Sequence, residues 1–237
     1  MTDYYVLSEI RCKGLKSGVI HDFHKSLRGR KCYLITCEKG EDCWFGCNFG
    51  NLDDIDYHRI KTTTVIECKH NDDGSIEVET YNTFYKFRPF GGFHTVEGDV
   101  FESNADVIVH QVNCQGVMGS GVAKQVREKF PKVFKAYQKC CRDTLTPLGH
   151  TLFVNSEGTV IANLFAQDKF GYDGKCYTDY EALRQCLTEL SARCRGKVVA
   201  IPYLMACHRG GGDWDKVSKM IQEVLVDCDV TFYKYTA

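Results

Sequence analysis

Hydrophobic residues change their spacing within one stretch of the chain, residues 107–130. Residues 107–109 are a short run of valine and isoleucine, which is typical of a buried β-strand. Apolar residues then recur every fourth position, on one side of a predicted helix, at Val122, Val126 and Phe130. Between the two patterns lie Asn113 and three glycines, Gly116, Gly119 and Gly121. The stretch therefore predicts a strand, a glycine-rich loop and a helix.

A glycine-rich loop at the start of a helix has two interpretations. Glycine lets the backbone approach a ligand closely, and the first turn of a helix offers free N–H groups and a partial positive charge. On this interpretation the loop is a cradle for an anion, usually a phosphate. The other interpretation is a tight connection that binds nothing. The spacing matches neither the dinucleotide pattern G-x-G-x-x-G nor the Gly-Lys-Ser/Thr of nucleotide–magnesium sites.

The rest of the C-terminal part alternates between strand and helix patterns. Strands are predicted at residues 93–97, 151–155, 159–165, 197–202 and 229–235. Helices are predicted at residues 131–142, where Pro131 suits the first position, at 179–193, and from 213 onward. A second glycine run, residues 210–212, again joins a strand to a helix. Such alternation predicts an α/β fold with helices on both faces of a mostly parallel sheet.

Residues 1–90 have a different pattern. β-branched and aromatic residues concentrate at 31–37, 42–49, 61–68, 76–80 and 83–87, and residues 71–75 are typical of a hairpin turn. We expect a small all-β or α+β domain, an antiparallel sheet or barrel with one helix or irregular segment near residues 19–27. Residues 88–92, Arg-Pro-Phe-Gly-Gly, indicate a linker. The chain is thus predicted to divide into a domain of unknown role at 1–90 and a second domain at 91–237.

Composition narrows the class of protein. A hydrophobic share of 43% in 237 residues allows a substantial core, and a net charge of −1 gives no strong signal for a nucleic-acid partner. No apolar run approaches a membrane span, and the first residues lack the hydrophobic segment of a signal peptide. We expect a cytoplasmic protein without a membrane partner, in which the 14 cysteines are reduced. The sequence does not indicate an oligomeric state.

Four cysteines of the N-terminal part raise the question of a zinc site: Cys37, Cys43, Cys47 and Cys68. Structural zinc sites usually contain paired C-x-x-C knuckles, which these spacings lack. We therefore expect buried free thiols and no metal site.

The string VIVHQVNCQGVMGSGVAKQVREKFP, preceded by Gly98-Asp99-Val100, resembles the macro domains, which bind ADP-ribose and its derivatives. The resemblance runs from about residue 93 to the C-terminus. It is closer to the branch that includes ADP-ribose-1''-phosphate phosphatases and terminal ADP-ribose hydrolases than to the histone-type branch. It implies a three-layer α/β/α sandwich with a mixed, mostly parallel sheet. The expected ligand is ADP-ribose or a derivative, with no cofactor and no metal.

The resemblance also implies roles for individual residues. Asp99 matches the acid that accepts a hydrogen bond from the adenine amino group, although a helix-cap or turn aspartate would fit the same place. Asn113 matches the asparagine beside the distal ribose. The first phosphate loop corresponds to Gly116, Val117, Met118, Gly119, Ser120, Gly121 and Val122. The second loop corresponds to Cys207, His208, Arg209, Gly210, Gly211 and Gly212. Further ligand contacts are expected at Val100, Gln167 and Tyr235.

Catalysis remains open at this point. His110 lies three residues before Asn113, as in the fungal-type phosphatases, and histidine exchanges protons near neutral pH. It would activate a water molecule held by Asn113, with His208 as the rival base. The alternative for His110 is a packed core histidine.

The branch that removes ADP-ribose from proteins or DNA has a lysine just after the strand that matches residues 161–165. Here Ala166, Gln167 and Asp168 follow that strand, and Lys169 is displaced. Some members of that branch carry an acid in the second loop, where Asp213 is the nearest candidate and helix capping is its simpler role. Three functions therefore stay open: a hydrolase acting on the distal ribose end, a non-catalytic binding module, and a de-ADP-ribosylating hydrolase.

Overall fold

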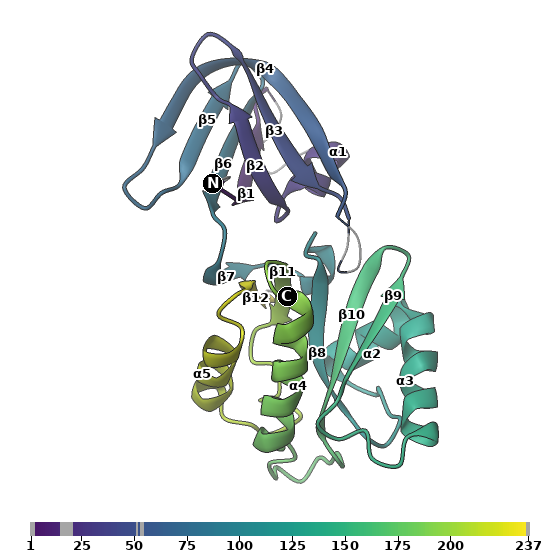
Figure 1. The fold of residues 1–237 in the computed structure, drawn as a ribbon. Helices are drawn as coiled ribbons and strands as arrows, with labels where there is room; N and C mark the ends of the chain where they lie inside the picture. Colours follow the sequence, from purple (N-terminus) through teal and green to yellow (C-terminus); the bar gives the residue numbers. More distant parts are fainter. Residues whose placement is uncertain (1–2, 15–20, 51, 53–54, 236–237) are drawn as a thin grey trace. The chain divides into compact units, whose positions relative to one another are not determined.

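In the computed structural model the chain forms two compact units (Figure 1). The structure describes residues 3–14, 21–50, 52 and 55–235. The first unit comprises Met1–Phe90 with Ser103–Ala105, and the second comprises Gly91–Glu102 with Asp106–Ala237. None of the described helices is long and apolar enough to cross a membrane.

The first unit is a closed barrel of six antiparallel strands, in which β1 pairs with both β2 and β6. Its strands are β1 (Tyr5–Cys12), β2 (Lys31–Thr36), β3 (Asp42–Asn48), β4 (Tyr57–His70), β5 (Ile76–Thr80) and β6 (Thr83–Pro89). Buried and half-buried residues alternate along β5 and β6, as expected of strands with one face on a core. That core includes Leu7, Phe45 and Phe87, none of which is exposed to solvent. A short helix, α1 (Asp22–Leu27), falls in the segment predicted near 19–27, whose first two residues lie outside the described part.

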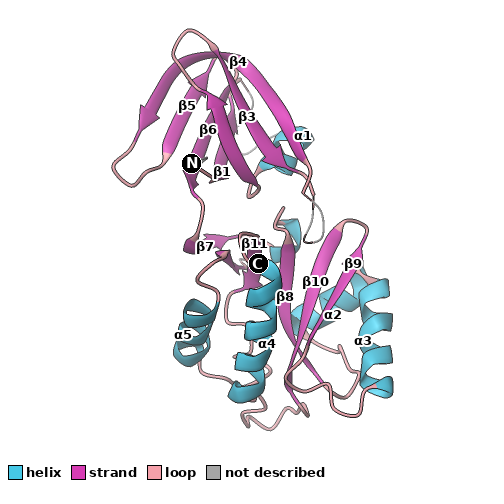
Figure 2. Cartoon of the chain, in the orientation of Figure 1, coloured by secondary structure: helices cyan, strands magenta, loops and turns pink. Residues whose placement is uncertain are grey.

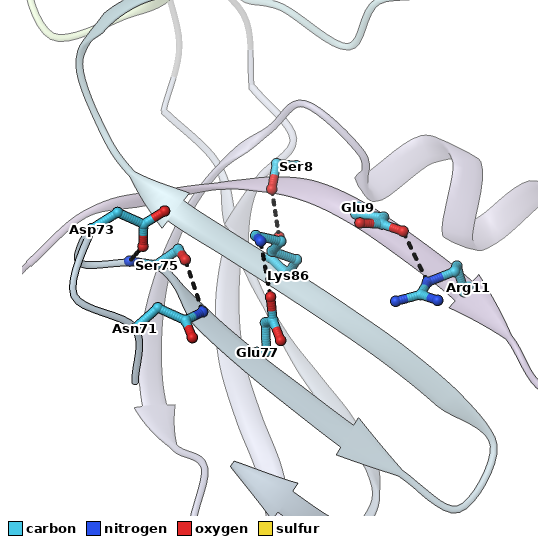
Figure 3. A network of polar contacts seen from close by, with 8 residues as sticks. All are labelled: Ser8, Glu9, Arg11, Asn71, Asp73, Ser75, Glu77 and Lys86. Carbon is cyan, nitrogen blue, oxygen red and sulfur yellow. Dashed lines mark hydrogen bonds and ion pairs between the residues drawn. The ribbon is translucent and has the colours of Figure 1, made fainter. Parts of the chain in front are cut away.

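The hairpin between β4 and β5 lies at the predicted turn, residues 71–75 (Figure 3). The carboxylate of Asp73 accepts a hydrogen bond from the Ser75 N–H at 2.9 Å, and Asn71 donates to the Ser75 hydroxyl at 3.0 Å. Across β5 and β6, the Lys86 ammonium lies 2.8 Å from the Glu77 carboxylate. These contacts belong to the barrel, and none of them involves the second unit.

The second unit is built on a six-stranded mixed sheet in the order β7-β12-β11-β8-β10-β9. The strands are β7 (Gly92–Glu97), β8 (Val107–Asn113), β9 (Thr151–Ser156), β10 (Thr159–Gln167), β11 (Val198–Pro202) and β12 (Asp229–Lys234). All neighbours pair in parallel except the edge strand β9, which is antiparallel to β10. The predicted mixed, mostly parallel sheet is therefore confirmed.

Helices cover both faces of this sheet: α4 lies in front of it in Figure 2 and α2 behind it. The helical segments are the 3₁₀ turn η1 (Val100–Glu102), α2 (Gly121–Lys129), α3 (Pro131–Asp143), α4 (Tyr180–Cys194) and α5 (Trp214–Val224). Pro131 occupies the start of α3, as predicted. The apolar side of α4 is fully buried at Leu183, Leu187 and Leu190. Because β8, β10, β11 and β12 all run in parallel, their carboxyl ends lie at the same edge of the sheet, where loops and helix starts gather.

Candidate functional site

A cleft of about 490 Å³ lies at this edge of the sheet. The cleft is lined by the last residues of β8, β10 and β11, which are Asn113, Gln167 and Pro202. It is also lined by Tyr235, which directly follows β12. In open α/β sheets, ligands bind outside the carboxyl ends of the strands, where neighbouring connections run in opposite directions. Here β8 is flanked by β10 and β11, so the cleft occupies such a position.

The start of helix α2 forms one wall of the cleft. Ser120 is its N-cap residue, but the Ser120 side chain makes no capping hydrogen bond, and the first turn contains no acid. In contrast, α4 and α5 are capped by the carboxylates of Asp179 and Asp213. The capping role expected for Asp213 is thereby confirmed. The first N–H groups of α2 are left to face the cleft with their partial positive charge, which favours an anion.

Gly121 opens this wall to a ligand. Its backbone has a φ of 57°, a left-handed conformation that glycine adopts without strain, and a Cβ built there would meet nothing within 4 Å. A side chain at this position would project into open space beside the helix start. The residues of the predicted first loop that line the cleft are Val117, Gly119, Ser120, Gly121 and Val122. Gly116 and Met118 are not among the lining residues, and Met118 is buried.

The Asn113 side chain holds this loop in shape. Its Nδ2 donates to the Val117 carbonyl at 2.6 Å, and its Oδ1 accepts from the Gln115 N–H at 2.9 Å and from the Tyr137 hydroxyl at 2.8 Å. Both ends of the amide are therefore engaged within the protein. Asn113 lines the cleft and is 8% exposed, so its first effect is to fix the loop beside the ligand space.

His110 lines the cleft from β8 but is almost fully buried. Its Nε2 lies 2.9 Å from Asn163 Oδ1, and its Nδ1 has no partner. Burial lowers the pKa of His110 to about 4, because an imidazolium there would lose its hydration. The imidazole is therefore neutral at physiological pH.

The second wall is the segment between β11 and α5. His208 and Arg209 are exposed there and line the cleft, and the Arg209 guanidinium lies 4.8 Å above the Tyr172 ring. Leu204 and Ala206 adopt left-handed φ values of 61° and 70° in this segment. Such backbone conformations are uncommon outside glycine.

The glycine run of the second loop has a packing explanation. A Cβ on Gly210 would collide with the Thr178 hydroxyl and the Ala206 carbonyl, and one on Gly211 would lie 2.6 Å from the Lys175 carbonyl. The Gly212 N–H already donates to the Ala206 carbonyl. Gly210 lines the cleft, whereas Gly211, Gly212 and Cys207 do not.

Asp99, which was expected to contact adenine, and Val100, which was expected to contact the ligand, lie outside the lining of the cleft. Asp99 Oδ1 accepts from the Phe101 N–H at 3.0 Å, as an aspartate in a tight turn does, and Asp99 Oδ2 lies 3.8 Å from the Lys129 ammonium. Val100 is buried in η1. Their predicted ligand contacts stay predictions.

Sequence patterns missed the aromatic and polar residues that complete the cleft. These include Phe170, Tyr172, Tyr203 and Gln111. Gln111 Nε2 donates to the side-chain oxygens of Gln167 and Thr178, and this network anchors the floor. Tyr203 directly follows a predicted strand, a position that could have drawn attention, whereas Phe170 and Tyr172 lie in an irregular segment without a periodic signal. None of the described lining residues is a lysine, an aspartate or a glutamate.

Comparisons with known proteins agree with this architecture. A model of the Macro domain family matches residues 109–221. A DNA ADP-ribosyl glycohydrolase from Thermus aquaticus is 30% identical over 135 residues, which are 55% of this chain and 37% of that protein. An ADP-ribose 1''-phosphate phosphatase from Neosartorya fischeri is 36% identical over 52 residues, which are 22% of this chain and 26% of that protein. The chain thus covers well under half of the length of either relative.

The solved macrodomain of Mycobacterium tuberculosis DarG superposes with a TM-score of 0.53 at 26% identity, over 60% of this chain and 97% of that one. The macrodomain of Thermus aquaticus DarG gives a TM-score of 0.51 at 27% identity. The segment that the family model matches, residues 109–221, falls in the second unit. The second unit therefore contains a macro domain, to which both the family model and the solved macrodomains are similar.

Proposed function

We propose that the cleft binds ADP-ribose or a derivative of it, and that the chain hydrolyses a terminal phosphate or ester on the distal ribose. The observation that carries this proposal is the uncapped start of α2, which opens into a cleft at the strand ends of a macro domain. An uncapped helix start next to a glycine is a general solution for binding phosphate without a metal.

The diphosphate is placed across the N–H groups of residues 119–122, beside the left-handed Gly121. Arg209 lies in the opposite wall and offers a second positive charge. The distal ribose is placed near Asn113, which acts by holding residues 115–117 in position, since both ends of its amide are engaged. The aromatic rings of Tyr172 and Tyr203 offer apolar surface for the sugar and base.

Hydrolysis needs a base for the attacking water. The water oxygen forms a bond to phosphorus, and a base takes up a proton of the water. The bond from phosphorus to the ribose oxygen breaks, and this oxygen takes up a proton to leave as a hydroxyl. His208 fits this role because it is exposed within the cleft. His110 fits it less well, because burial opposes the imidazolium that a base must become.

Two observations favour other functions. The described residues that line the cleft include no lysine, aspartate or glutamate, which favours binding without turnover. The glycohydrolase relative, in contrast, aligns with 55% of this chain and the phosphatase relative with 22%, which favours removal of ADP-ribose from an acceptor.

Three measurements on the purified chain separate these functions. Calorimetric titration with ADP-ribose tests binding, and release of phosphate from ADP-ribose 1''-phosphate tests the proposed hydrolysis. Release of ADP-ribose from an ADP-ribosylated oligonucleotide tests the glycohydrolase alternative. Binding with phosphate release supports the proposal, and binding without any release supports the binding module. If ADP-ribose does not bind, the assignment of the cleft is wrong.

A further inference from the structure

Two cysteines and a histidine come together in the barrel of the first unit. Cys37 directly follows β2, and Cys68 and His70 lie in β4. One ligand atom of each residue lies within 4.8 Å of the other two. Cys68 Sγ is 3.2 Å from Cys37 Sγ and 3.9 Å from His70 Nε2. This set is distinct from the cleft of the macro domain and has no part in the function proposed above.

The fold itself brings these residues together. Val65 N–H donates to the Glu41 carbonyl at 2.7 Å, and Gly40 N–H donates to the Val65 carbonyl at 2.9 Å. These two bonds hold the turn after β2 against β4, three residues before Cys68. Cys68 and His70 are two positions apart in a strand, so their side chains point to the same side.

The cluster opens into a cavity of about 480 Å³, so that an ion has a path to it. Cys37 and Cys68 are half-buried and His70 is exposed. Glu38 and Lys39 also line this cavity, together with Leu34, Ile35 and Thr36. An ion held by the three side chains would therefore keep one coordination position open to the cavity, where water or the Glu38 carboxylate can occupy it.

We propose that Cys37, Cys68 and His70 bind a zinc ion. Zinc takes four ligands in a tetrahedron and prefers thiolate sulfur and imidazole nitrogen, at about 2.3 Å and about 2.0–2.1 Å. Such ligand atoms are then roughly 3.5–3.8 Å apart, as follows from that geometry. The two sulfurs are 3.2 Å apart, roughly half an ångström short of the upper end of this range, and Cys68 Sγ lies 3.9 Å from His70 Nε2, so side-chain rotations would complete the site.

The third side chain favours a metal over a redox pair. A disulfide needs only the two sulfurs, whereas a metal site needs further ligands, and His70 supplies one. A metal displaces the proton of each thiol that it binds. The absence of C-x-x-C pairs, which led us to expect free thiols, is compatible with ligands that come from two separate strands.

Metal content of the full chain tests the proposal. The chain is purified with reduced thiols, loaded with zinc and dialysed against metal-free buffer, and zinc is measured by mass spectrometry. We expect one equivalent of zinc per chain. His70→Ala and Cys68→Ser should each lose at least tenfold in zinc affinity. Their matched controls are His58→Ala, another exposed histidine of β4, and Cys12→Ser, a half-buried thiol of the same barrel. Both controls should retain zinc.

Cobalt provides a second measurement that does not depend on the stability of the variants. Cobalt bound by two thiolates and an imidazole in a tetrahedron gives intense visible and thiolate-to-metal absorption bands, and zinc should abolish them by displacement. The proposal is overturned if the unmutated chain binds neither metal with reduced thiols. It is equally overturned if His70→Ala binds as tightly as the His58→Ala control, or if peptide mapping finds Cys37 joined to Cys68 by a disulfide in chain prepared with zinc.

Discussion

His110 Nε2 lies 2.9 Å from Asn163 Oδ1, and this bond determines which imidazole nitrogen carries the proton. Asn163 Nδ2 donates to the Leu152 carbonyl at 3.0 Å, so the amide orientation leaves Oδ1 as the acceptor for His110. Nε2 of the neutral imidazole is consequently the donor, and Nδ1 keeps a lone pair without a partner. The sequence left two roles possible for His110, a catalytic base or a packed core histidine. In the structure its side chain is hydrogen-bonded to Asn163, its neighbour on β10.

Stability should fall with acid because of this buried imidazole. The pKa of His110 is lowered to about 4 in the folded chain, against 6.5 for an ordinary histidine. The unfolded chain therefore binds the extra proton first, and stability is lost as the pH falls from about 6.5 towards 4. The loss should reach at most about 3 kcal/mol. Urea unfolding of the unmutated chain and of His110→Gln at several pH values measures it.

The His110→Gln variant should lose this part of the pH dependence. His208→Gln is the matched control, because it replaces an exposed histidine that lines the same cleft. Equal slopes in the unmutated chain and His110→Gln between pH 4 and 6.5 would show that His110 does not titrate as its burial requires.

The two histidines of the cleft should differ in catalysis. If the chain hydrolyses ADP-ribose 1''-phosphate, His208→Ala should lower kcat by roughly 10²–10⁴-fold, which is the usual contribution of a general base. Its affinity for ADP-ribose should stay within a few-fold. His110→Gln should lose far less kcat, because its proton affinity in the folded chain is too low for a strong base. Steady-state phosphate release gives both values, and the reverse order would assign the base to His110.

A fragment of residues 91–237 should fold and bind ADP-ribose with the affinity of the full chain. Every described residue that lines the cleft lies in the second unit. The Gly91 N–H donates to the Asp229 carboxylate at 2.9 Å, so this end of the fragment is anchored at the start of β12. Calorimetry on the fragment and the full chain provides the comparison. A soluble fragment that does not bind would show that the barrel contributes to the site.

Local patterns were sufficient for elements whose periodicity is unbroken. The β8 and α2 segments were predicted because a β-branched run and a four-residue spacing stand next to each other. In contrast, β1 was missed because a register irregularity between Leu7 and Glu9 interrupts its alternation. A bulge of this kind moves the following side chains to the other face, so the period of two is lost.

The site was harder to predict because its geometry depends on distant residues. The glycines at 210 and 211 look like a phosphate loop, yet their neighbours Lys175 and Thr178 come from a segment some thirty residues earlier, as the contacts show. Cys37 and Cys68 are 31 residues apart and meet because the turn after β2 is hydrogen-bonded to β4. The spacing of residues along the sequence does not predict such contacts. The sequence does show which residue types stand at the ends of the predicted strands.

Asp99 should reveal whether it recognises adenine or only caps a turn. If it recognises adenine, Asp99→Ala should weaken ADP-ribose binding by about 1–3 kcal/mol and remove the preference over GDP-ribose. Asp99→Asn separates the roles, because an amide oxygen can still accept from the Phe101 N–H. Competition titrations with both nucleotides measure the preference. If the unmutated chain binds GDP-ribose and ADP-ribose equally, Asp99 has only its structural role.

A negative charge at Gly121 should weaken ligand binding more than one elsewhere in the chain. Its Cβ would meet no atom within 4 Å and would lie beside the uncapped start of α2, where the phosphate is proposed to bind. Gly121→Glu should therefore fill this space with a like charge and weaken ADP-ribose binding at least tenfold, about 1.4 kcal/mol.

Gly158→Glu is the matched control, since Gly158 also has a positive φ and open space around it but lies in the turn between β9 and β10. Calorimetry and thermal unfolding of both variants separate lost binding from backbone strain: both should lose similar stability, and only Gly121→Glu should lose the ligand. Retention of ADP-ribose by Gly121→Glu would place the diphosphate elsewhere in the cleft.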